Sequence, residues 1–152
     1  MRAFLAECRD LPCLDLDLDA CLSIWEEAIA LPATKEAGAP RWLHGDLLAE
    51  NLLLREGRLA AVLDFGSLSV GDPAVDLIVG WEVLDSPGRE LFRSIVDVDE
   101  VTWLRGRAWA LAIALMTFSY YWQTMPQRCA NRLTMARAVL ADAAALHSNR
   151  GL

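Results

Sequence analysis

Basic residues are scarce in this sequence. It contains 14 lysines and arginines against 21 aspartates and glutamates, its formal net charge is −7, and Lys35 is its only lysine. Non-specific binding to nucleic acid needs a basic face that displaces counterions, so the composition excludes nucleic acid as a partner. An acidic surface would suit a cationic substrate, although composition alone is explained as well by the need to keep an apolar protein soluble.

The sequence also lacks the cysteine and histidine patterns of zinc sites and disulfide scaffolds. Its four cysteines include no Cys-x-x-Cys pair, and its two histidines, His44 and His147, stand far apart. No zinc site can be assigned to such spacings. A signal peptide is not recognisable at the start, so we expect a cytoplasmic protein whose thiols stay reduced and have no chemical role.

Long apolar runs are nearly absent. Residues 108–125 carry no charge, but this stretch only reaches the lower limit for a membrane span. Thr117, Ser119 and Gln123 interrupt its apolar character, and Arg105 and Arg107 shortly precede it. We therefore predict a buried core helix and exclude a membrane span.

The 152 residues, 55% of them hydrophobic and 23% charged, are enough for one globular domain with a core of its own. We predict a single domain, 1–152, that is mainly α with a small β-hairpin (α+β). A leading helical segment spans 1–41, loops and a hairpin span 42–71, and a helical bundle spans 72–147.

Apolar periodicity and capping residues predict the individual helices. Asp19 is a good N-cap for the second helix, and Asp72 followed by Pro73 is typical of a helix start. The expected helices cover residues 1–9, 19–31, 73–84, 86–96, 100–124 and 127–146, with Pro126 closing the fifth and a loop over 34–41.

The most informative stretch begins at His44-Gly45-Asp46, continues to Asn51, and reaches Asp64-Phe65-Gly66 thirteen residues later. Phosphoryl transfer requires the electrostatic positioning of a nucleophile, a triphosphate and Mg²⁺. In this interpretation Asp46 is catalytic, because it would accept the proton of a substrate hydroxyl. Asn51 and Asp64 would supply the oxygen ligands that Mg²⁺ prefers, and would bind the nucleotide through the metal.

The spacing of these residues fits a hairpin. Strands over 51–54 and 59–63, joined by a turn over 55–58, would bring Asp64 out beside Asn51. Gly66 would then let the backbone turn away without placing a side chain in the site.

From Trp42 to Leu77 the sequence resembles the aminoglycoside phosphotransferase family of small-molecule kinases. The resemblance rests on the motif from His44 to Gly66, on the leucines after Asn51, and on Gly-Asp-Pro-Ala-Val-Asp-Leu at 71–77. It implies the C-terminal catalytic lobe of a protein-kinase-like fold, with ATP (or GTP) and Mg²⁺ as cofactors. The acceptor would be a hydroxyl of a small molecule, such as an aminoglycoside or another amino-containing compound. His44 and Asp76 would support the catalytic loop and not take part in the chemistry.

The resemblance does not extend to the N-terminal lobe. Kinases of this type carry a glycine-rich strand pair and a phosphate-gripping lysine before the catalytic loop. No such loop precedes His44, and Lys35 is a poor candidate for that lysine. We expect an absent N-terminal lobe, weak or no activity for the chain alone, and either a homodimer or a separate N-terminal lobe over the uncovered surface. The alternative function is a non-catalytic binding or interaction module derived from such a kinase.

Overall fold

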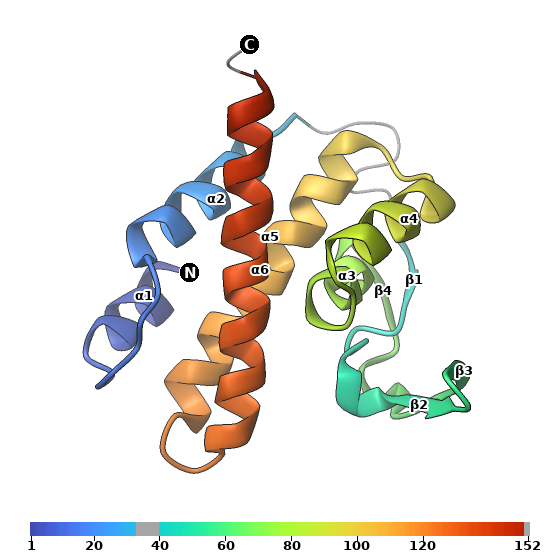
Figure 1. The fold of residues 1–152 in the computed structure, drawn as a ribbon, viewed down its shortest axis with the longest axis horizontal. Coiled ribbons are helices and arrows are strands. Elements are labelled where there is room, and N and C mark those ends of the chain that lie inside the picture. Colours follow the sequence, from blue (N-terminus) through green and yellow to red (C-terminus); the bar gives the residue numbers. More distant parts are fainter. Residues whose placement is uncertain (33–39, 151–152) are drawn as a thin grey trace. The chain divides into compact units, whose positions relative to one another are not determined.

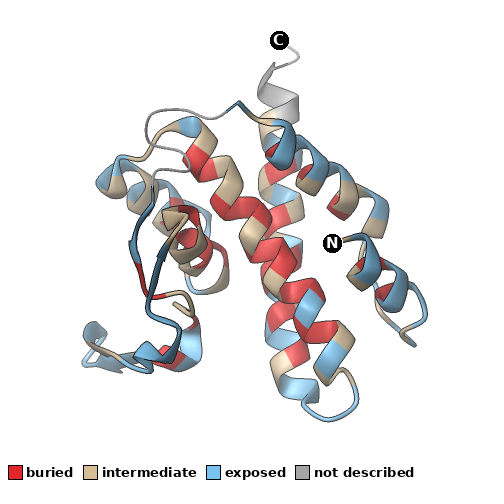
Figure 2. Ribbon diagram, turned by 180° about the vertical axis from the view of Figure 1, so that it is seen from behind, coloured by how far each residue is buried: buried red, intermediate tan, exposed pale blue. Residues whose placement is uncertain are grey.

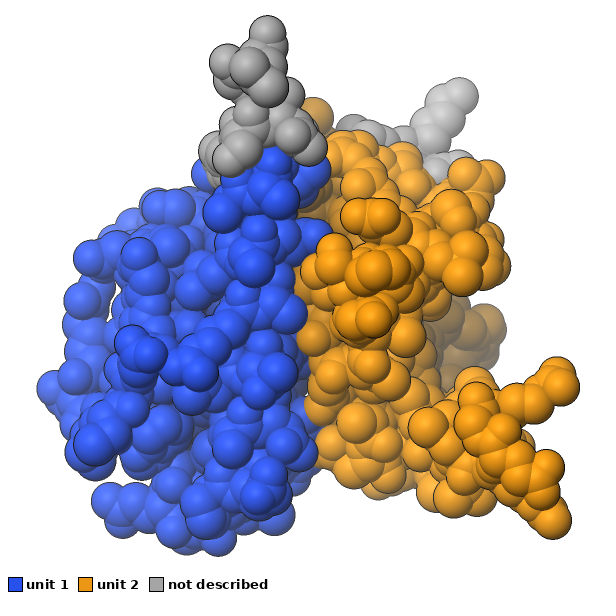
Figure 3. Space-filling view, viewed as in Figure 1, with its two compact units in different colours: residues 1–31, 108–152 blue, residues 32–107 orange. Residues whose placement is uncertain are grey.

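The computed structural model describes residues 1–32 and 40–150, with side chains through Leu146, so Lys35 and most of the predicted loop over 34–41 lie outside the described residues. The described chain is mostly helical, with two small antiparallel sheets of two strands each (Figure 1). This confirms the mainly helical fold with small antiparallel strands. Two compact units divide the chain, one made of 1–31 and 108–152 and the other of 32–107 (Figure 3). The single domain remains a prediction.

Within its described residues, the first unit is built from helices alone. It contains α1 (Arg2–Arg9), α2 (Leu18–Ala30), the later part of α5 (Glu100–Tyr121) and α6 (Pro126–Arg150). Burial follows helical spacing on α2, where Cys21, Ile24 and Ala28 are buried (Figure 2). Much of its remaining core comes from α5 and α6, including Ala110, Leu111, Ala114, Leu115, Phe118, Met135, Ala136 and Val139.

Two helix boundaries in this unit differ from the sequence prediction. The N-cap of α2 is Asp17 and not Asp19, because the Asp17 carboxylate accepts from the backbone N–H groups of Asp19 (3.1 Å) and Ala20 (2.9 Å). Asp19 instead lies in the first turn and pairs with Arg9. Helix α5 already ends at Tyr121. Pro126 follows this end, and it also belongs to the next helix. It is the first residue of α6, the position where proline is tolerated because its missing N–H would be unpaired anyway.

Burial keeps two thiols of this unit protonated. It raises the pKa of Cys8 to about 11 and that of Cys21 to about 12. Cys13, by contrast, is exposed. No helix within the described residues is both long and apolar enough to span a membrane.

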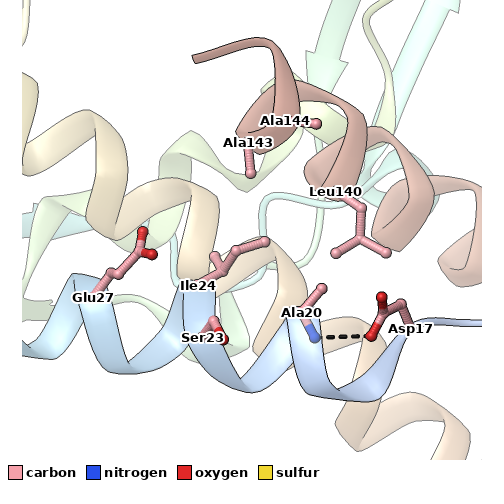
Figure 4. A pocket seen from close by; sticks show the side chains of 8 residues that line it. All are labelled: Asp17, Ala20, Ser23, Ile24, Glu27, Leu140, Ala143 and Ala144. Atoms are coloured by element: carbon pink, nitrogen blue, oxygen red, sulfur yellow. Dashed lines mark hydrogen bonds between the residues drawn. The ribbon is translucent and has the colours of Figure 1, made fainter. Parts of the chain in front are cut away.

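A cavity of about 440 Å³ lies between α2 and α6 in the first unit (Figure 4). Asp17, Ser23 and Glu27 contribute its polar lining, and Ile24 and Leu140 are among its apolar residues. None of the residues predicted for phosphoryl transfer lines this cavity.

The second unit holds both sheets. Strand β1 (Arg41–Leu43) pairs with β4 (Ser69–Gly71), and β2 (Leu52–Arg55) pairs with β3 (Arg58–Val62). Over residues 40–107 the helical elements are the 3-10 helices η1 (Ala49–Asn51), η2 (Phe65–Ser67) and η3 (Pro73–Ile78), then α3 (Val79–Glu82), α4 (Ser86–Val96) and the start of α5. The β1–β4 sheet was not predicted, because three-residue strands separated by a whole hairpin leave no periodic signal.

The predicted hairpin is present, with each strand displaced by one residue. Glu56 and Gly57 form its tip with φ angles of 53° and 74°. Two successive left-handed residues are what a two-residue turn of type I′ requires. The hairpin places Leu52 opposite Val62, so the ends of the two strands carry Asn51 and Asp64 to the same side of the unit.

The helix predicted over 73–84 is present in part, but its first residues form a 3-10 helix and not an α-helix. Asp72 caps it, accepting from the N–H of Ala74 at 3.1 Å, and Pro73 comes next, but the segment is the 3-10 helix η3 up to Ile78 and α-helical only from Val79 to Glu82. The backbone of Asp72 also favours a 3-10 start, because its carbonyl oxygen accepts from the N–H of Val75, three residues further on. Arg105 on α5 donates to the other Asp72 oxygen, from Nε at 3.0 Å.

Close packing fixes η3 against α5. A Cβ added at Gly106 would lie 2.7 Å from the Leu77 Cβ and 3.1 Å from the Ala74 carbonyl oxygen. Only glycine allows this approach of the two elements. The position of η3, and with it that of Asp76, therefore depends on a glycine about 30 residues further along the chain.

Candidate active site

The site is organised on the loop from His44 to Asn51, which Asp76 holds at its start. One Asp76 oxygen accepts from the backbone N–H of His44 at 2.7 Å, and the other accepts from that of Gly45 at 2.9 Å. A carboxylate that accepts two backbone hydrogen bonds fixes both peptide planes. Asp76 comes from η3 and thus positions the residues directly before Asp46.

His44 is a structural link in this loop. It is buried, its Nε2 lies 2.9 Å from the Leu63 carbonyl oxygen, and its Nδ1 accepts from the N–H of Asp46 at 3.3 Å. Both contacts are satisfied by the neutral tautomer with its proton on Nε2, which donates to Leu63. This arrangement occupies both ring nitrogens, so His44 connects the loop to the end of the hairpin.

Asp46 and Asn51 contact each other directly. The Asn51 Nδ2 donates to the Asp46 carbonyl oxygen at 2.8 Å and to the Asp46 Oδ2 at 3.0 Å. These two bonds use both Nδ2 hydrogens, so the Asn51 amide oxygen is the atom left to act as a ligand. The Asn51 amide donates to the Oδ2 atom of Asp46 and not to its Oδ1 atom.

Asp64 follows the hairpin in a left-handed conformation, with φ 56° and ψ 71°. Its Oδ1 accepts from the Gly66 N–H at 3.2 Å and starts η2. The hairpin connects it to Asn51, because the Leu63 N–H donates to the Asn51 carbonyl oxygen at 2.8 Å. The residue before Asp64 is thus bonded to Asn51, as the predicted hairpin requires.

Gly45 brings the loop from His44 to Asn51 against the segment after Asp64. Its φ is +81°, and an added Cβ would lie 2.5 Å from the Ser67 carbonyl oxygen. The β1–β4 pairing, with Leu43 opposite Ser69, produces this approach. The Phe65 ring also packs edge-on against His44, with ring centroids 4.9 Å apart.

One contact of the loop could not be predicted from the sequence. The Glu82 Oε2 accepts from the backbone N–H of Ala49 at 2.8 Å, and so fixes the start of η1. In the sequence Glu82 is one of several acidic residues on the late helices, and its isolated position gave no signal of a contact 33 residues away.

The donor set at the site suits Mg²⁺. Asn51 offers an amide oxygen and Asp64 a carboxylate, and magnesium in proteins is held by one or two such oxygens together with waters and phosphates. Within residues 1–32 and 40–146, no three His, Cys, Asp or Glu side chains gather as a metal-binding group. The amide oxygen of Asn51 and the carboxylate of Asp64 fit a metal that is also bound by phosphate.

Most of the chain is similar to known phosphotransferases. A family model described as the phosphotransferase enzyme family matches residues 2–113. No curated protein matches the chain. Among solved structures, the chain is similar to the ADP-bound aminoglycoside phosphotransferase APH(2'')-Ib, with 20% identity, a TM-score of 0.39, and coverage of 91% of this chain and 53% of that one. It is also similar to APH(2")-IIa in a ternary complex with streptomycin and ATP, with 22% identity, a TM-score of 0.43, and coverage of 91% and 50%. This chain spans about half the length of these two structures.

Proposed function

This chain belongs to the phosphotransferase enzyme family, and we propose that it is the C-terminal catalytic lobe of an ATP-dependent kinase acting on a hydroxyl of a small molecule. The observation that carries the proposal is the joint arrangement of Asp46, Asn51 and Asp64. A loop braced by Asp76 and a hairpin connected through Leu63 support these three residues.

In this proposal Asp46 positions the acceptor and takes its proton. Asn51 holds one carboxylate oxygen of Asp46, so the other can accept a hydrogen bond from the substrate hydroxyl and direct its oxygen toward the γ-phosphorus. Because the Asp46 carbonyl is also bonded to Asn51, backbone and side chain move together.

Asn51 and Asp64 would hold Mg²⁺ through the Asn51 amide oxygen and the Asp64 carboxylate. When bound, the metal would neutralise charge on the phosphates of ATP (or GTP). The Leu53 and Leu63 side chains, 51% and 46% exposed, lie on the same hairpin and offer an apolar platform for a nucleotide base. For the acceptor, the chain's negative net charge favours an amino-containing compound.

The proposal includes a cytoplasmic location for the protein. It also includes a nucleotide-binding site that this chain alone does not complete. The four cysteines are free thiols, which suits a reducing compartment. Since no glycine-rich loop precedes His44 in this sequence, we expect activity of this polypeptide alone to be weak or absent. Completion would come from an N-terminal lobe, and the uncovered surface would allow a homodimer in its absence.

The test is a calorimetric titration of ATP into the 152-residue protein with and without Mg²⁺. We expect saturable binding that requires Mg²⁺ and that Asp64→Ala weakens at least about thirtyfold, because a charged ligand to the metal is lost. Circular dichroism should show an unchanged fold, since Asp64 is exposed. Glu90→Ala, which removes an exposed carboxylate from α4, is the matched control and should bind as the parent does. Equal affinity in Asp64→Ala and the parent would refute the metal assignment, and a parent without affinity would refute nucleotide binding by this lobe alone.

A second prediction concerns the exposed face of the β1–β4 sheet. Trp42 and Val70 are directly paired across the strands and are 73% and 55% exposed, while the neighbouring Leu43 is buried on the other face. Leu68, directly before β4, is exposed as well. Light scattering coupled to size exclusion should show a dimer at concentrations on the order of tens of micromolar or above, because such a face gains from being covered.

Trp42→Asp should restore the monomer. Tyr120→Asp is its control, because Tyr120 is a similarly exposed aromatic residue of α5 in the other unit, and this variant should remain dimeric. A monomeric parent at high concentration would contradict the prediction, and so would loss of the dimer in the control.

A further inference from the structure

Two carboxylates from one short segment hold the catalytic loop, one on each side of Asp46. Asp76 in η3 accepts from the backbone of His44 and Gly45, and Glu82 at the end of α3 accepts from that of Ala49. We infer that Glu82 is a second positioning residue, which fixes η1 and thereby sets the amide of Asn51 against Asp46. This inference rests on the proposed function and assigns a role to a residue outside the sequence motif.

The start of η1 has no cap of its own. Its N-cap residue is Leu48, whose side chain cannot accept a hydrogen bond, and no side-chain cap is formed there. A short 3-10 helix leaves its first N–H groups unpaired unless another element supplies an acceptor. Glu82 is that acceptor, with Oε2 at 2.8 Å from the Ala49 N.

The contacts of Asn51 explain why this bond matters to the site. The Asn51 N–H donates to the Leu48 carbonyl oxygen at 2.9 Å, and the Asn51 side chain donates twice to Asp46. Ala49 lies in the sequence between Leu48 and Asn51, the two residues joined by the backbone bond. If its N–H were released, η1 could rotate, and the Asn51 amide would lose its alignment with the Asp46 carboxylate.

The winding of the segment helps both carboxylates reach one loop. Asp76 and Glu82 are six residues apart, which corresponds to ~10 Å along the axis of a segment that is 3-10 at its start and α-helical at its end. About three residues per turn over η3 bring the two side chains nearer to one face than a continuous α-helix would. The 3-10 start of this segment was not predicted from the sequence. It helps Asp76 and Glu82 to bond to the same loop.

We assign Glu82 a positioning role and not a catalytic one, because it accepts from the backbone N–H of Ala49. Asp76 bonds only the residues before Asp46, whereas Glu82 adds a bond from outside the loop to a residue after Asp46. With Glu82 the loop is held at both ends, and Asn51 becomes a fixed ligand.

The test compares Glu82→Met with Glu82→Gln in the full chain. Glutamine retains an acceptor oxygen at the same reach, whereas methionine has a similar length and no comparable acceptor. In Glu82→Met we expect amide hydrogen exchange of Ala49 to accelerate about tenfold or more, and the side-chain amide resonances of Asn51 to shift in NMR spectra. Glu82→Gln should resemble the parent in both measurements.

Binding of Mg-ATP is the second readout. It should weaken about tenfold in Glu82→Met, and stay within about twofold of the parent in Glu82→Gln and in the control Glu90→Met. Equal effects of glutamine and methionine would overturn the inference, because charge and not the acceptor would then matter. Unchanged Asn51 resonances in Glu82→Met would overturn it as well. If the parent does not bind Mg-ATP, the proposed function fails, while the exchange and resonance measurements still decide whether Glu82 positions Asn51.

Discussion

Replacing Gly45 by alanine is expected to lower the free energy of unfolding by roughly 3–5 kcal/mol. Two costs add at this position. The φ of +81° lies in the left-handed region, which a residue with a Cβ adopts at a cost of about 1–2 kcal/mol. The added Cβ would also lie 2.5 Å from the Ser67 carbonyl oxygen and 3.1 Å from a Leu43 methyl carbon, so the end of η2 would have to move.

Gly57 offers a matched control for this prediction. Its φ of +74° is nearly the same, but an added Cβ would meet nothing within 4 Å. Gly57→Ala should therefore cost only the conformational strain, about 1–2 kcal/mol. Urea denaturation of both variants measures the difference. If the two variants lose equal stability, the close approach to Ser67 is not what requires glycine at position 45.

The second large effect is expected at Trp81, where substitution by alanine should cost about 3–5 kcal/mol. Trp81 is 2% exposed, its ring centroid lies 4.7 Å from that of Trp103, and the Arg89 guanidinium carbon lies 5.9 Å from its ring centroid. Removing the indole would leave a large cavity in the core of the second unit. Because Trp81 directly precedes Glu82, the variant should also loosen the loop that Glu82 holds.

Trp81→Phe separates packing from hydrogen bonding. The indole Nε1 is buried and has no hydrogen-bond partner among the described residues, so phenylalanine loses volume without leaving a polar partner unsatisfied. Its loss should be about half that of alanine or less, measured by thermal and urea unfolding followed by circular dichroism. A loss in Trp81→Phe as large as that in Trp81→Ala would show that ring packing does not dominate here.

The sequence predicted the parts of the molecule that local chemistry determines. Capping by Asp72, the hairpin, and most helices appear close to the expected places, because a capping carboxylate or a turn residue acts within a few positions. The cap of α2 was misplaced by two residues, since Asp15, Asp17 and Asp19 alternate and each can cap. Only the hydrogen bonds of Asp17 decide between them.

Contacts between distant residues were beyond the reach of sequence patterns. The pairing of β1 with β4, the approach of Gly106 to Leu77 and the bond from Ala49 to Glu82 each join segments about 30 residues apart. Nothing in the periodicity of either segment marks its partner. The roles of Asp46, Asn51 and Asp64 remain predictions that nucleotide titrations would test, although the structure places hydrogen bonds between the first two and connects the third to them through Leu63.

The placement of the tryptophans has a spectroscopic consequence. Trp81 and Trp103 are neighbours in the second unit, with ring planes inclined at 41°, whereas Trp25 and Trp109 meet edge-on in the first, with centroids 6.0 Å apart and planes at 86°. Indole pairs this close couple their electronic transitions, and the sign and strength of the coupling depend on the mutual orientation. Each unit therefore carries an optical reporter of its own. Near-ultraviolet dichroism of single Trp→Phe variants can thus separate the melting of the unit that holds Asp46 from that of the helical unit.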